Sequence, residues 1–464
     1  MAEQHPSSFR DPAGFIFTEK DVVYRQINKA GKADYDQLMA SGLYDALVER
    51  DLLVTHTEVK APKPTGKDGY TVIRPATIPF ISYPYEWSFS QLKDAALLTL
   101  RIQKIALKYG MVLKDASAYN IQFIGKKPVL IDTLSFMPYV EGEPWEGYKQ
   151  FCEHFLAPLA LASYTSLDAL KFLRSDLEGI SLQLTTKLLP RRARLKPGLL
   201  SHIYLHSNAQ EKYKNIASDE PGKEVPMRKV SRFALEGLVS SLEQTVRKLK
   251  PPKQQTEWGD YYTFTNYSDA GFEKKRAMVR EFLEAVSPAP TMVWDIGANN
   301  GEFSSLAAEK DIHTVAFDID PLAVERNYLN REVKSHTENM LPLLQDVINP
   351  SPANGLMGME RASMQQRGPA DVVMALALIH HLSIGRNLPF ERLAEMLAGI
   401  GKHILIEFVP KEDSKVRILL TTRRDVFPDY NEADFEKAMS TYFTLVKSQR
   451  IDGTKRTLYL FKRK

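Results

Sequence analysis

Residues 293–304 read VWDIGANNGEFS, an apolar run that ends in an acid and continues as Asp295-x-Gly297-x-x-x-Gly301. The pattern predicts a buried strand that turns sharply into a helix. Glycine allows positive φ in such a turn and, having no Cβ, lets the backbone approach a ligand closely. An acid at the C-terminal end of a strand faces the crevice where open α/β sheets bind ligands. The stretch therefore predicts a ligand site on an α/β sheet.

The chain around this motif alternates strand-like and helix-like segments. An amphipathic helix is predicted at 272–285. Buried strands are predicted at 292–296, 313–318, 370–376 and 403–408, and a closing hairpin at 443–450 and 457–462. This alternation predicts a doubly wound, Rossmann-like α/β domain in the C-terminal half.

Acids also follow the next two apolar runs. The run DIDP begins at the end of the second predicted strand, and its first acid, Asp318, lies 23 residues after Asp295, close to the spacing of about 20 expected for a ribose-binding acid. An acid at this spacing accepts hydrogen bonds from the ribose hydroxyls of an adenosine. The second acid, Asp320, suits either the ribose or the N-cap of a helix that begins at Pro321. Asp346 ends a third apolar run and offers a carboxylate to the adenine amino group.

Together these motifs resemble class I S-adenosylmethionine-dependent methyltransferases over residues 258–464. The glycine pattern has their Asp/Glu-x-Gly-x-x-x-Gly form rather than the Gly-x-Gly-x-x-Gly of nicotinamide enzymes. The resemblance implies a seven-stranded sheet and S-adenosylmethionine as the cofactor. It implies a cofactor site made of Asp295, Gly297, Asn299, Gly301, Asp318, Asp346 and Leu376. Ordinary turn and cap chemistry is the alternative interpretation of these residues.

Further stretches are similar to a group of bacterial methyltransferases named for a nodulation protein. They are WxxYxxFxNYS at 258–268, ALALIHHL at 375–382, LIEFVPKED at 405–413 and RxLYLF at 456–461. This resemblance implies the class of enzyme and leaves the methyl acceptor open.

Two histidines at the end of the fourth predicted strand are the candidates for catalysis. Methyl transfer from a sulfonium depends on close positioning, and it needs a base only where the acceptor carries a proton. His380 or His381 could supply that base, because imidazole titrates near neutrality. The alternative is that both histidines satisfy nearby backbone groups.

Other polar residues could form the acceptor region. Glu407 and the charges at 411–413 could shape a polar acceptor site, and the alternative is ordinary charges in a surface loop. The long insertion at 346–371 is typical of a lid. It carries Arg361 and Arg367, which could pair with an anionic acceptor.

A second motif lies nearer the N-terminus, where residues 113–136 read LKDASAYNIQFIGKKPVLIDTLSF. This stretch resembles the catalytic and metal loops of kinase-like folds. The resemblance implies Asp115 as the base for an accepting hydroxyl, with Asn120 and Asp132 holding magnesium at the phosphates of ATP. The chain lacks a glycine-rich loop and a clear catalytic lysine, for which Arg25 is the nearest candidate. An active phosphotransferase, a scaffold without that activity and ordinary turn residues all stay open.

The N-terminal third is expected to fold separately. A strand–turn–strand hairpin is predicted at 14–27, and a long amphipathic helix at 89–109 ends before Gly110 as a C-cap. With the kinase-like motif, these elements predict an α+β kinase-like domain over residues 1–186.

A basic segment joins the two halves. Residues 187–256 are expected to be a helical connector, with one helix near 230–249, before a methyltransferase domain at 257–464. Residues 187–254 hold 15 Lys/Arg against 6 Asp/Glu. Such an excess is typical of a solvated face, or of a surface that attracts an anionic substrate.

Composition sets limits on the function. Of the 464 residues, 44% are hydrophobic and 25% charged, as in soluble proteins of two or three domains. No apolar run is long enough for a membrane span, and the first residues lack the apolar core of a secretion signal. The single cysteine, Cys152, excludes an intrachain disulfide and a cysteine-based zinc site, and it fits the cytoplasm. The net charge of +4 does not by itself indicate nucleic acid.

The sequence therefore predicts a cytoplasmic S-adenosylmethionine-dependent methyltransferase whose acceptor is a small molecule, a glycan or a lipid-linked intermediate. The first alternative is a bifunctional kinase–methyltransferase that uses ATP and magnesium. The second is an RNA or protein methyltransferase that docks through the basic connector. The third is a binding protein without enzymatic activity.

Overall fold

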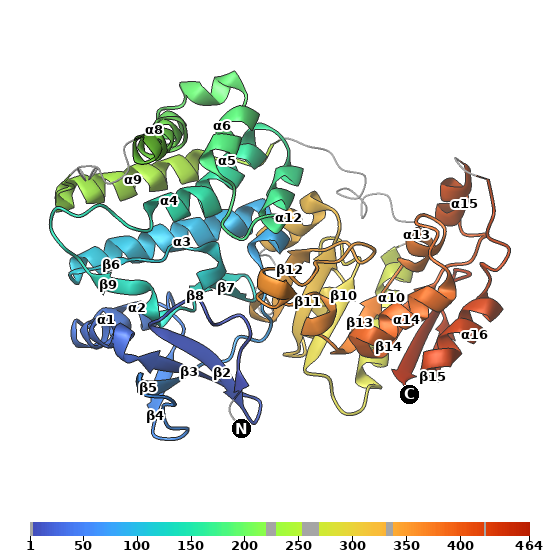
Figure 1. Cartoon of the computed structure of the whole chain (residues 1–464). Helices are drawn as coiled ribbons and strands as arrows, with labels where there is room; N and C mark the ends of the chain where they lie inside the picture. The colour runs from blue at the N-terminus through green and yellow to red at the C-terminus, as the bar shows by residue number, and fades with distance from the viewer. Residues whose placement is uncertain (1–2, 220–228, 253–268, 331–336, 422–423) are drawn as a thin grey trace. The chain divides into compact units, whose positions relative to one another are not determined.

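The computed structural model describes residues 3–219, 229–252, 269–330, 337–421 and 424–464 (Figure 1). The chain divides into two compact units. The first is Met1–Lys253 with Gly355–Glu360, and the second is Gln254–Asn354 with Arg361–Lys464. The expected connector boundary at 256/257 and the WxxYxxFxNYS motif lie outside the described residues.

The N-terminal unit begins with an antiparallel sheet in the order β1-β2-β3-β5-β4. Its strands are β1 Glu3–Gln4, β2 Gly14–Glu19, β3 Val22–Asn28, β4 His56–Val59 and β5 Gly69–Pro75. The predicted hairpin is confirmed as β2 and β3, paired in register from Gly14 with Ile27 to Glu19 with Val22.

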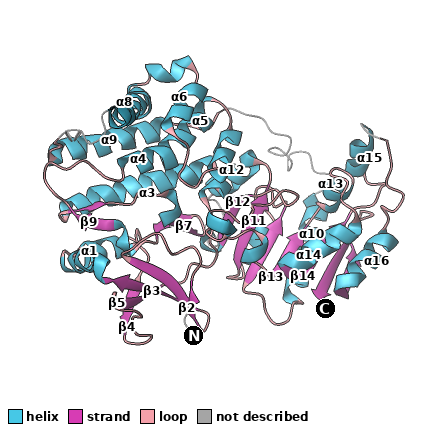
Figure 2. Cartoon of the chain, viewed as in Figure 1, coloured by secondary structure: helices cyan, strands magenta, loops and turns pink. Residues whose placement is uncertain are grey.

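Helices make up most of the rest of this unit (Figure 2). They are α1 Lys29–Ala40, α2 Leu43–Val48, α3 Phe89–Lys108, α4 Tyr148–Phe151, α5 Ala157–Tyr164, α6 Leu182–Leu188, α7 Pro197–Leu199, α8 His206–Asp219 and α9 Arg232–Lys248. Short strands β6 Met111–Leu113 and β9 Phe136–Pro138 form one pair, and β7 Ile121–Ile124 and β8 Lys127–Leu130 form another. The helices predicted at 89–109 and 230–249 are confirmed as α3 and α9. Described residues of the expected connector thus contribute helices to this unit, which extends to Lys253.

The C-terminal unit is built on a seven-stranded sheet in the order β12-β11-β10-β13-β14-β16-β15, with only β16 antiparallel to its neighbours β14 and β15. The strands are β10 Met292–Ile296, β11 His313–Asp318, β12 Met340–Leu344, β13 Ala370–Ala375, β14 Gly401–Phe408, β15 Phe443–Arg450 and β16 Thr457–Arg463. All predicted strands are confirmed. The strand order reverses between β10 and β13, which is where such sheets bind ligands.

Helices cover both faces of this sheet (Figure 2). They are α10 Asp269–Glu284, α11 Ser304–Ala308, α12 Pro321–Leu329, α13 Ile379–Ser383, α14 Phe390–Ile400, α15 Ser414–Thr421 and α16 Glu432–Tyr442. Strand side chains alternate between the faces. Leu458 and Leu460 of β16 join an apolar cluster with Phe282 of α10, whereas Tyr459 and Phe461 contact Phe435 of α16. Both faces of β16 therefore pack against helices.

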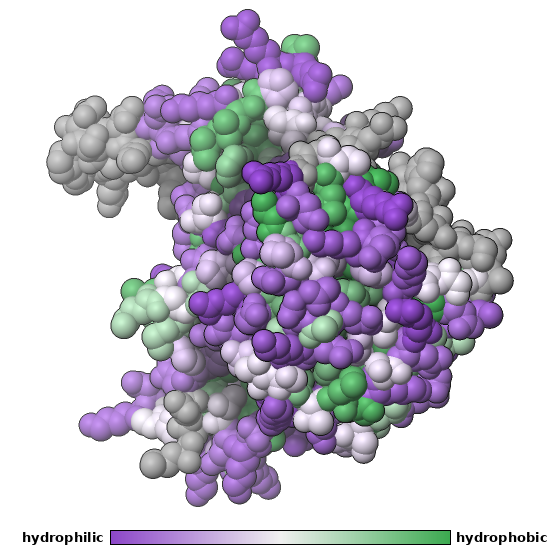
Figure 3. Space-filling model, turned by 90° about the vertical axis from the view of Figure 1, so that its right-hand side faces the viewer, coloured by the Kyte–Doolittle hydropathy of each residue, from purple (hydrophilic) through white to green (hydrophobic). Residues whose placement is uncertain are grey.

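The surface shows apolar side chains scattered among hydrophilic ones on the face drawn in Figure 3. Among the described residues, no helix combines the length and the apolar character that a membrane crossing requires.

Candidate active site

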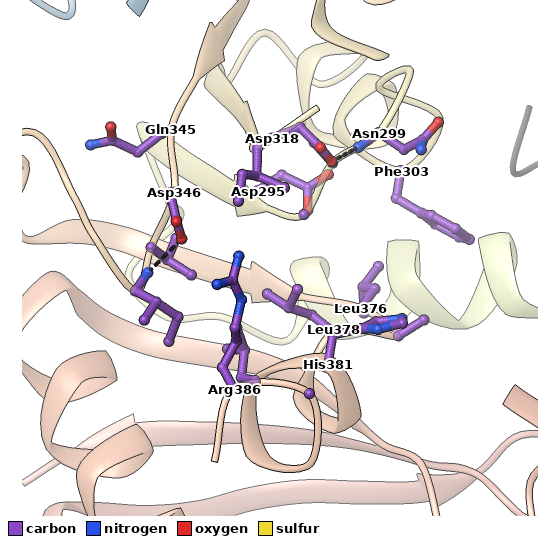
Figure 4. Close-up of a pocket in the computed structure, with 18 of the residues that line it drawn as sticks. Asp295, Asn299, Phe303, Asp318, Gln345, Asp346, Leu376, Leu378, His381 and Arg386 are labelled. Atoms are coloured by element: carbon purple, nitrogen blue, oxygen red, sulfur yellow. Dashed lines mark hydrogen bonds between the residues drawn. The ribbon is translucent and has the colours of Figure 1, made fainter. Parts of the chain in front are cut away.

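A cavity of about 330 Å³ opens at the carboxyl ends of β10, β11, β12 and β13 (Figure 4). Seven of the predicted cofactor and catalytic residues line it. They are Asp295, Gly297, Asn299, Asp318, Asp346, Leu376 and His381. The two others, Gly301 and His380, are not part of its wall. The cavity lies wholly within the C-terminal unit.

The glycine-rich turn after β10 is held against β11 by backbone hydrogen bonds. The backbone N–H groups of Gly297 and Ala298 both donate to the carbonyl of Phe317, at 2.9 and 3.0 Å. Asn299 has φ of +51° and donates its N–H to Asp318 Oδ2 at 2.7 Å. The turn is thus fixed with its backbone facing the cavity.

Gly301 serves packing rather than the cavity wall. Its φ is +86°, and a Cβ at this position would lie 2.5 Å from Nδ2 of Asn327 on α12. The positive φ favours glycine there, and a side chain would also have to displace the amide group of Asn327. Gly301 is not part of the cavity wall, and its role at the cofactor stays a prediction.

Two buried aspartates form the acidic side of the cavity. Asp295 accepts a 2.6 Å hydrogen bond from Ser304 Oγ, and Asp318 accepts backbone N–H groups of Asn299 and Asp320. Burial, with a smaller contribution from Asp318, raises the pKa of Asp295 to about 7. Burial also raises the pKa of Asp318 to about 6. Both carboxylates would be stabilised by a ligand that brings positive charge or hydrogen-bond donors.

The remaining predicted acids divide between cavity and helix cap. Asp346 lines the cavity after β12, beside Gln345, and accepts the N–H of Ile348 at 2.9 Å. Asp320 does not line it. Asp320 Oδ1 accepts the N–H of Leu322 at 2.8 Å, so the N-cap interpretation of Asp320 is the one that the structure supports.

Sequence reasoning missed two cationic residues of the cavity wall, Lys275 and Arg386. Lys275 projects from α10 and is almost wholly buried, with Nζ 4.6 Å from the ring centre of Phe303. The signal for Lys275 was its position on the apolar stripe of the predicted helix, between Phe272 and Phe282. Arg386, after α13, carries no comparable sequence signal.

Lys275 belongs to a buried network of four charges. Its Nζ lies 2.6 Å from Glu407 Oε2, and Arg456 Nη1 lies 3.0 Å from Glu407 Oε1. Arg456 also pairs with Asp413 at 2.8 Å. Burial alone would raise the pKa of Glu407, but the charges of Lys275 and Arg456 lower it to about 2. Glu407 and Asp413 therefore supply the two negative charges of this network. The expectation that Glu407 shapes an acceptor site is wrong, because Glu407 is fully buried in β14.

The two histidines differ in their access to the cavity. His381 lines it, whereas His380 is 1% exposed and lies behind the wall in α13. Burial and the charge of Arg456 lower the pKa of His381 to about 4. His381 is therefore the histidine placed to contact a ligand in this cavity, and its lowered pKa makes it a neutral imidazole at physiological pH.

The expected lid arginines do not reach the cavity wall. The backbone of Arg361 pairs with that of Asn354 in an isolated antiparallel β-bridge. Arg367 Nε donates a hydrogen bond to the carbonyl of Ser363 at 3.4 Å. Neither arginine lines the cavity. The insertion contains short helical turns at Leu356–Gly358 and Gln365–Arg367.

In the N-terminal unit, the kinase-like residues do come together. Asn120 hydrogen-bonds Asp115, whose pKa is raised by burial and by the charge of Asp132. Asp132 itself forms an ion pair with Arg25 and accepts Ser135 Oγ at 2.6 Å. In the part of the chain that the structure describes, no group of three or more His, Cys, Asp or Glu side chains could hold a metal ion.

The sheet order, the single antiparallel strand and the acids at three successive strand ends define the class I S-adenosylmethionine-dependent methyltransferases, and this protein is a member of that class. No family profile matches the chain. The chain is 35% identical over 460 residues to nodulation protein NoeA of Rhizobium meliloti (strain 1021). The matched region covers 98% of this chain and 95% of that protein. The chain belongs to the NoeA family.

Solved structures of methyltransferases resemble the chain in part. Magnesium protoporphyrin IX methyltransferase from Synechocystis PCC 6803 is 18% identical, over 46% of this chain and 87% of that chain, with a TM-score of 0.31. The N-methyltransferase NodS from Bradyrhizobium japonicum WM9 is 14% identical, over 42% of this chain and 98% of that chain, with a TM-score of 0.31. The bifunctional kinase-methyltransferase WbdD is 16% identical, over 42% of this chain and 40% of that chain, with a TM-score of 0.29.

Proposed function

We propose that this protein transfers a methyl group from S-adenosylmethionine, bound in the cavity of the C-terminal unit, to a small molecule, a glycan or a lipid-linked intermediate. The observation that carries the proposal is the convergence of Asp295, Asp318 and Asp346 from three neighbouring strands on one cavity. Each carboxylate matches a different donor of the cofactor.

The cavity residues fit S-adenosylmethionine chemically. Asp295, buried and with a raised pKa, suits the amino group of the methionine portion. Asp318 would accept hydrogen bonds from the ribose hydroxyls, and Asp346 would accept one from the adenine amino group. Gly297 would let the backbone approach the cofactor, and Leu376 would supply apolar contact. When bound, the cofactor supplies an electrophilic methyl group on a sulfonium, and the protein holds the acceptor in line with it.

Titration of the purified full chain with S-adenosylmethionine tests the proposal. We expect micromolar binding by the wild type and a loss of at least about a hundredfold in Asp295→Ala/Asp318→Ala, because charge-assisted hydrogen bonds each contribute about 1.5–3 kcal/mol. Asp452→Asn is the matched control, since Asp452 is exposed and pairs only with Lys274 in the described structure. A wild type that binds no S-adenosylmethionine would overturn the proposal.

A second candidate activity is phosphotransfer by the N-terminal unit. It is supported by the proximity of Asp115, Asn120 and Asp132, which a kinase-like site requires. The ion pair of Asp132 with Arg25 opposes it, because the guanidinium takes the carboxylate that would hold magnesium. Magnesium-dependent ATP binding that is lost in Asp132→Ala, with S-adenosylmethionine binding unchanged, is the result expected of this candidate. Absence of ATP binding by the wild type rejects it.

A further inference from the structure

The two sides of the cavity carry opposite chemistry. The ends of β10, β11 and β12 supply carboxylates, whereas the segment after β13 supplies Leu378, His381, Leu382 and Arg386 (Figure 4). Because the three aspartates account for the cofactor, the side after β13 is where an acceptor would meet the methyl group. That side contains one permanent charge, which is positive.

Arg386 is available to bind an anion. It is exposed at the mouth of the cavity, and Figure 4 shows its guanidinium turned into the pocket. No described residue forms an ion pair or a side-chain hydrogen bond with it. Lys275, the other cation of the wall, is already held by Glu407 at 2.6 Å. Arg386 is therefore the cation of the cavity wall whose guanidinium is free to bind a ligand. Two of its N–H groups can donate in parallel to the two oxygens of a carboxylate.

The same side offers poor conditions for removing a proton. Among the described residues that line this side, His381 supplies the one imidazole, and burial together with the charges of Arg456 and Lys415 lowers the pKa of that ring to about 4. A base with so low a pKa removes protons from alcohols or ammonium groups inefficiently. An acceptor that is already an anion at neutral pH needs no base.

We infer that the methyl acceptor presents a carboxylate, which Arg386 binds and which leaves the enzyme as a methyl ester. The inference rests on the proposed function and names its substrate class. A lone pair of one carboxylate oxygen forms the new O–C bond as the C–S bond breaks. The bonding pair goes to sulfur, so that sulfonium and carboxylate become a neutral thioether and a neutral ester, and no proton moves.

A carboxylate also fits this cavity better than a phosphate does. A phosphate monoester carries about two negative charges near neutral pH. A single guanidinium would then oppose a dianion in a cavity that already holds three aspartates. One cation and one singly charged acceptor balance each other.

The test uses the full chain, S-adenosylmethionine with a tritiated methyl group, and a protein-free extract of cells that lack the gene. Methyl esters release volatile methanol in mild alkali, whereas N-methyl, ether and phosphate methyl groups do not. We expect alkali-labile label with the wild type and a loss of about tenfold or more in Arg386→Ala. Arg386→Lys should transfer more label than Arg386→Ala and less than the wild type, because lysine keeps the positive charge and loses the bidentate hydrogen bonds of the guanidinium. Arg392→Ala, which removes an exposed arginine outside the cavity, should equal the wild type.

Binding of S-adenosylmethionine separates this inference from the proposed function. We expect Arg386→Ala to bind the cofactor as the wild type does. A product whose label resists alkali, or an absence of alkali-labile label while the wild type binds the cofactor, overturns the carboxylate inference and leaves the cofactor site standing. Weakened cofactor binding in Arg386→Ala also overturns it, since Arg386 would then serve the cofactor. Only a wild type that fails to bind S-adenosylmethionine contradicts the proposed function.

Discussion

Replacing Glu407 by alanine is expected to lower the free energy of unfolding of the C-terminal unit by about 3–5 kcal/mol. Glu407 is fully buried and lies between the cations Lys275 and Arg456. Its removal leaves Lys275 buried beside the apolar ring of Phe303 without its carboxylate. Arg456 keeps Asp413 as a partner, so the cost falls mainly on Lys275.

Urea denaturation of the full chain, followed by circular dichroism, measures this effect. Glu395→Ala is the control, because it removes an exposed carboxylate paired with an exposed arginine on α14. The control should change stability by no more than about 0.5 kcal/mol. The double variant Lys275→Met/Glu407→Leu should recover much of the lost stability, since it removes both charges of the pair. A Glu407→Ala variant as stable as the control would show that the buried network does not hold this unit together.

Most strands of the C-terminal unit could be predicted from the sequence because they are short apolar runs bounded by turn residues. The register of β10 with β11 and β13 then places the strand ends at one edge. Acids at those ends converge for that reason alone. Asp295, Asp318 and Asp346 were therefore predictable as one site without any knowledge of side-chain packing.

The two cations of the cavity wall, Lys275 and Arg386, were not predictable in the same way. Lys275 comes from a helix upstream of β10, and its partner Glu407 lies 132 residues away in β14. Such a pair depends on which face of the sheet each side chain occupies. His380 and His381 are adjacent in the sequence, and only the course of α13 decides that His381 faces the cavity.

The N-terminal unit shows the same limit. The motif containing Asp115, Asn120 and Asp132 was visible as spacing, and the structure brings these residues together. The ion pair of Asp132 with Arg25 joins β3 to the turn after β8, which no local pattern encodes. The pair bears directly on function, because it uses the carboxylate that a metal would need.

Replacing Asp295 by asparagine is expected to stabilise the ligand-free protein at pH 8 by up to about 4 kcal/mol. Burial raises the pKa of Asp295 from 3.8 to about 7 in the folded state. Between these values the folded state holds a proton that the unfolded chain has released, so wild-type stability falls as pH rises from about 4 to about 7. Above pH 7 the whole cost of a buried carboxylate is present, and asparagine removes it while still accepting from Ser304 Oγ.

The stabilising effect of Asp295→Asn should therefore be small at pH 4.5, increase up to pH 7 and stay constant above it. Urea denaturation of both proteins at pH 4.5, 6 and 8 measures the trend, with Asp452→Asn as an exposed control that should show none. The variant should also bind S-adenosylmethionine about tenfold or more weakly, because an amide lacks the charge that the amino group of the cofactor requires. A variant that is more stable than the wild type and binds S-adenosylmethionine more weakly would show that Asp295 serves cofactor binding and destabilises the ligand-free fold. A variant less stable than the wild type at pH 8 would show instead that the ionised carboxylate is satisfied by the protein itself.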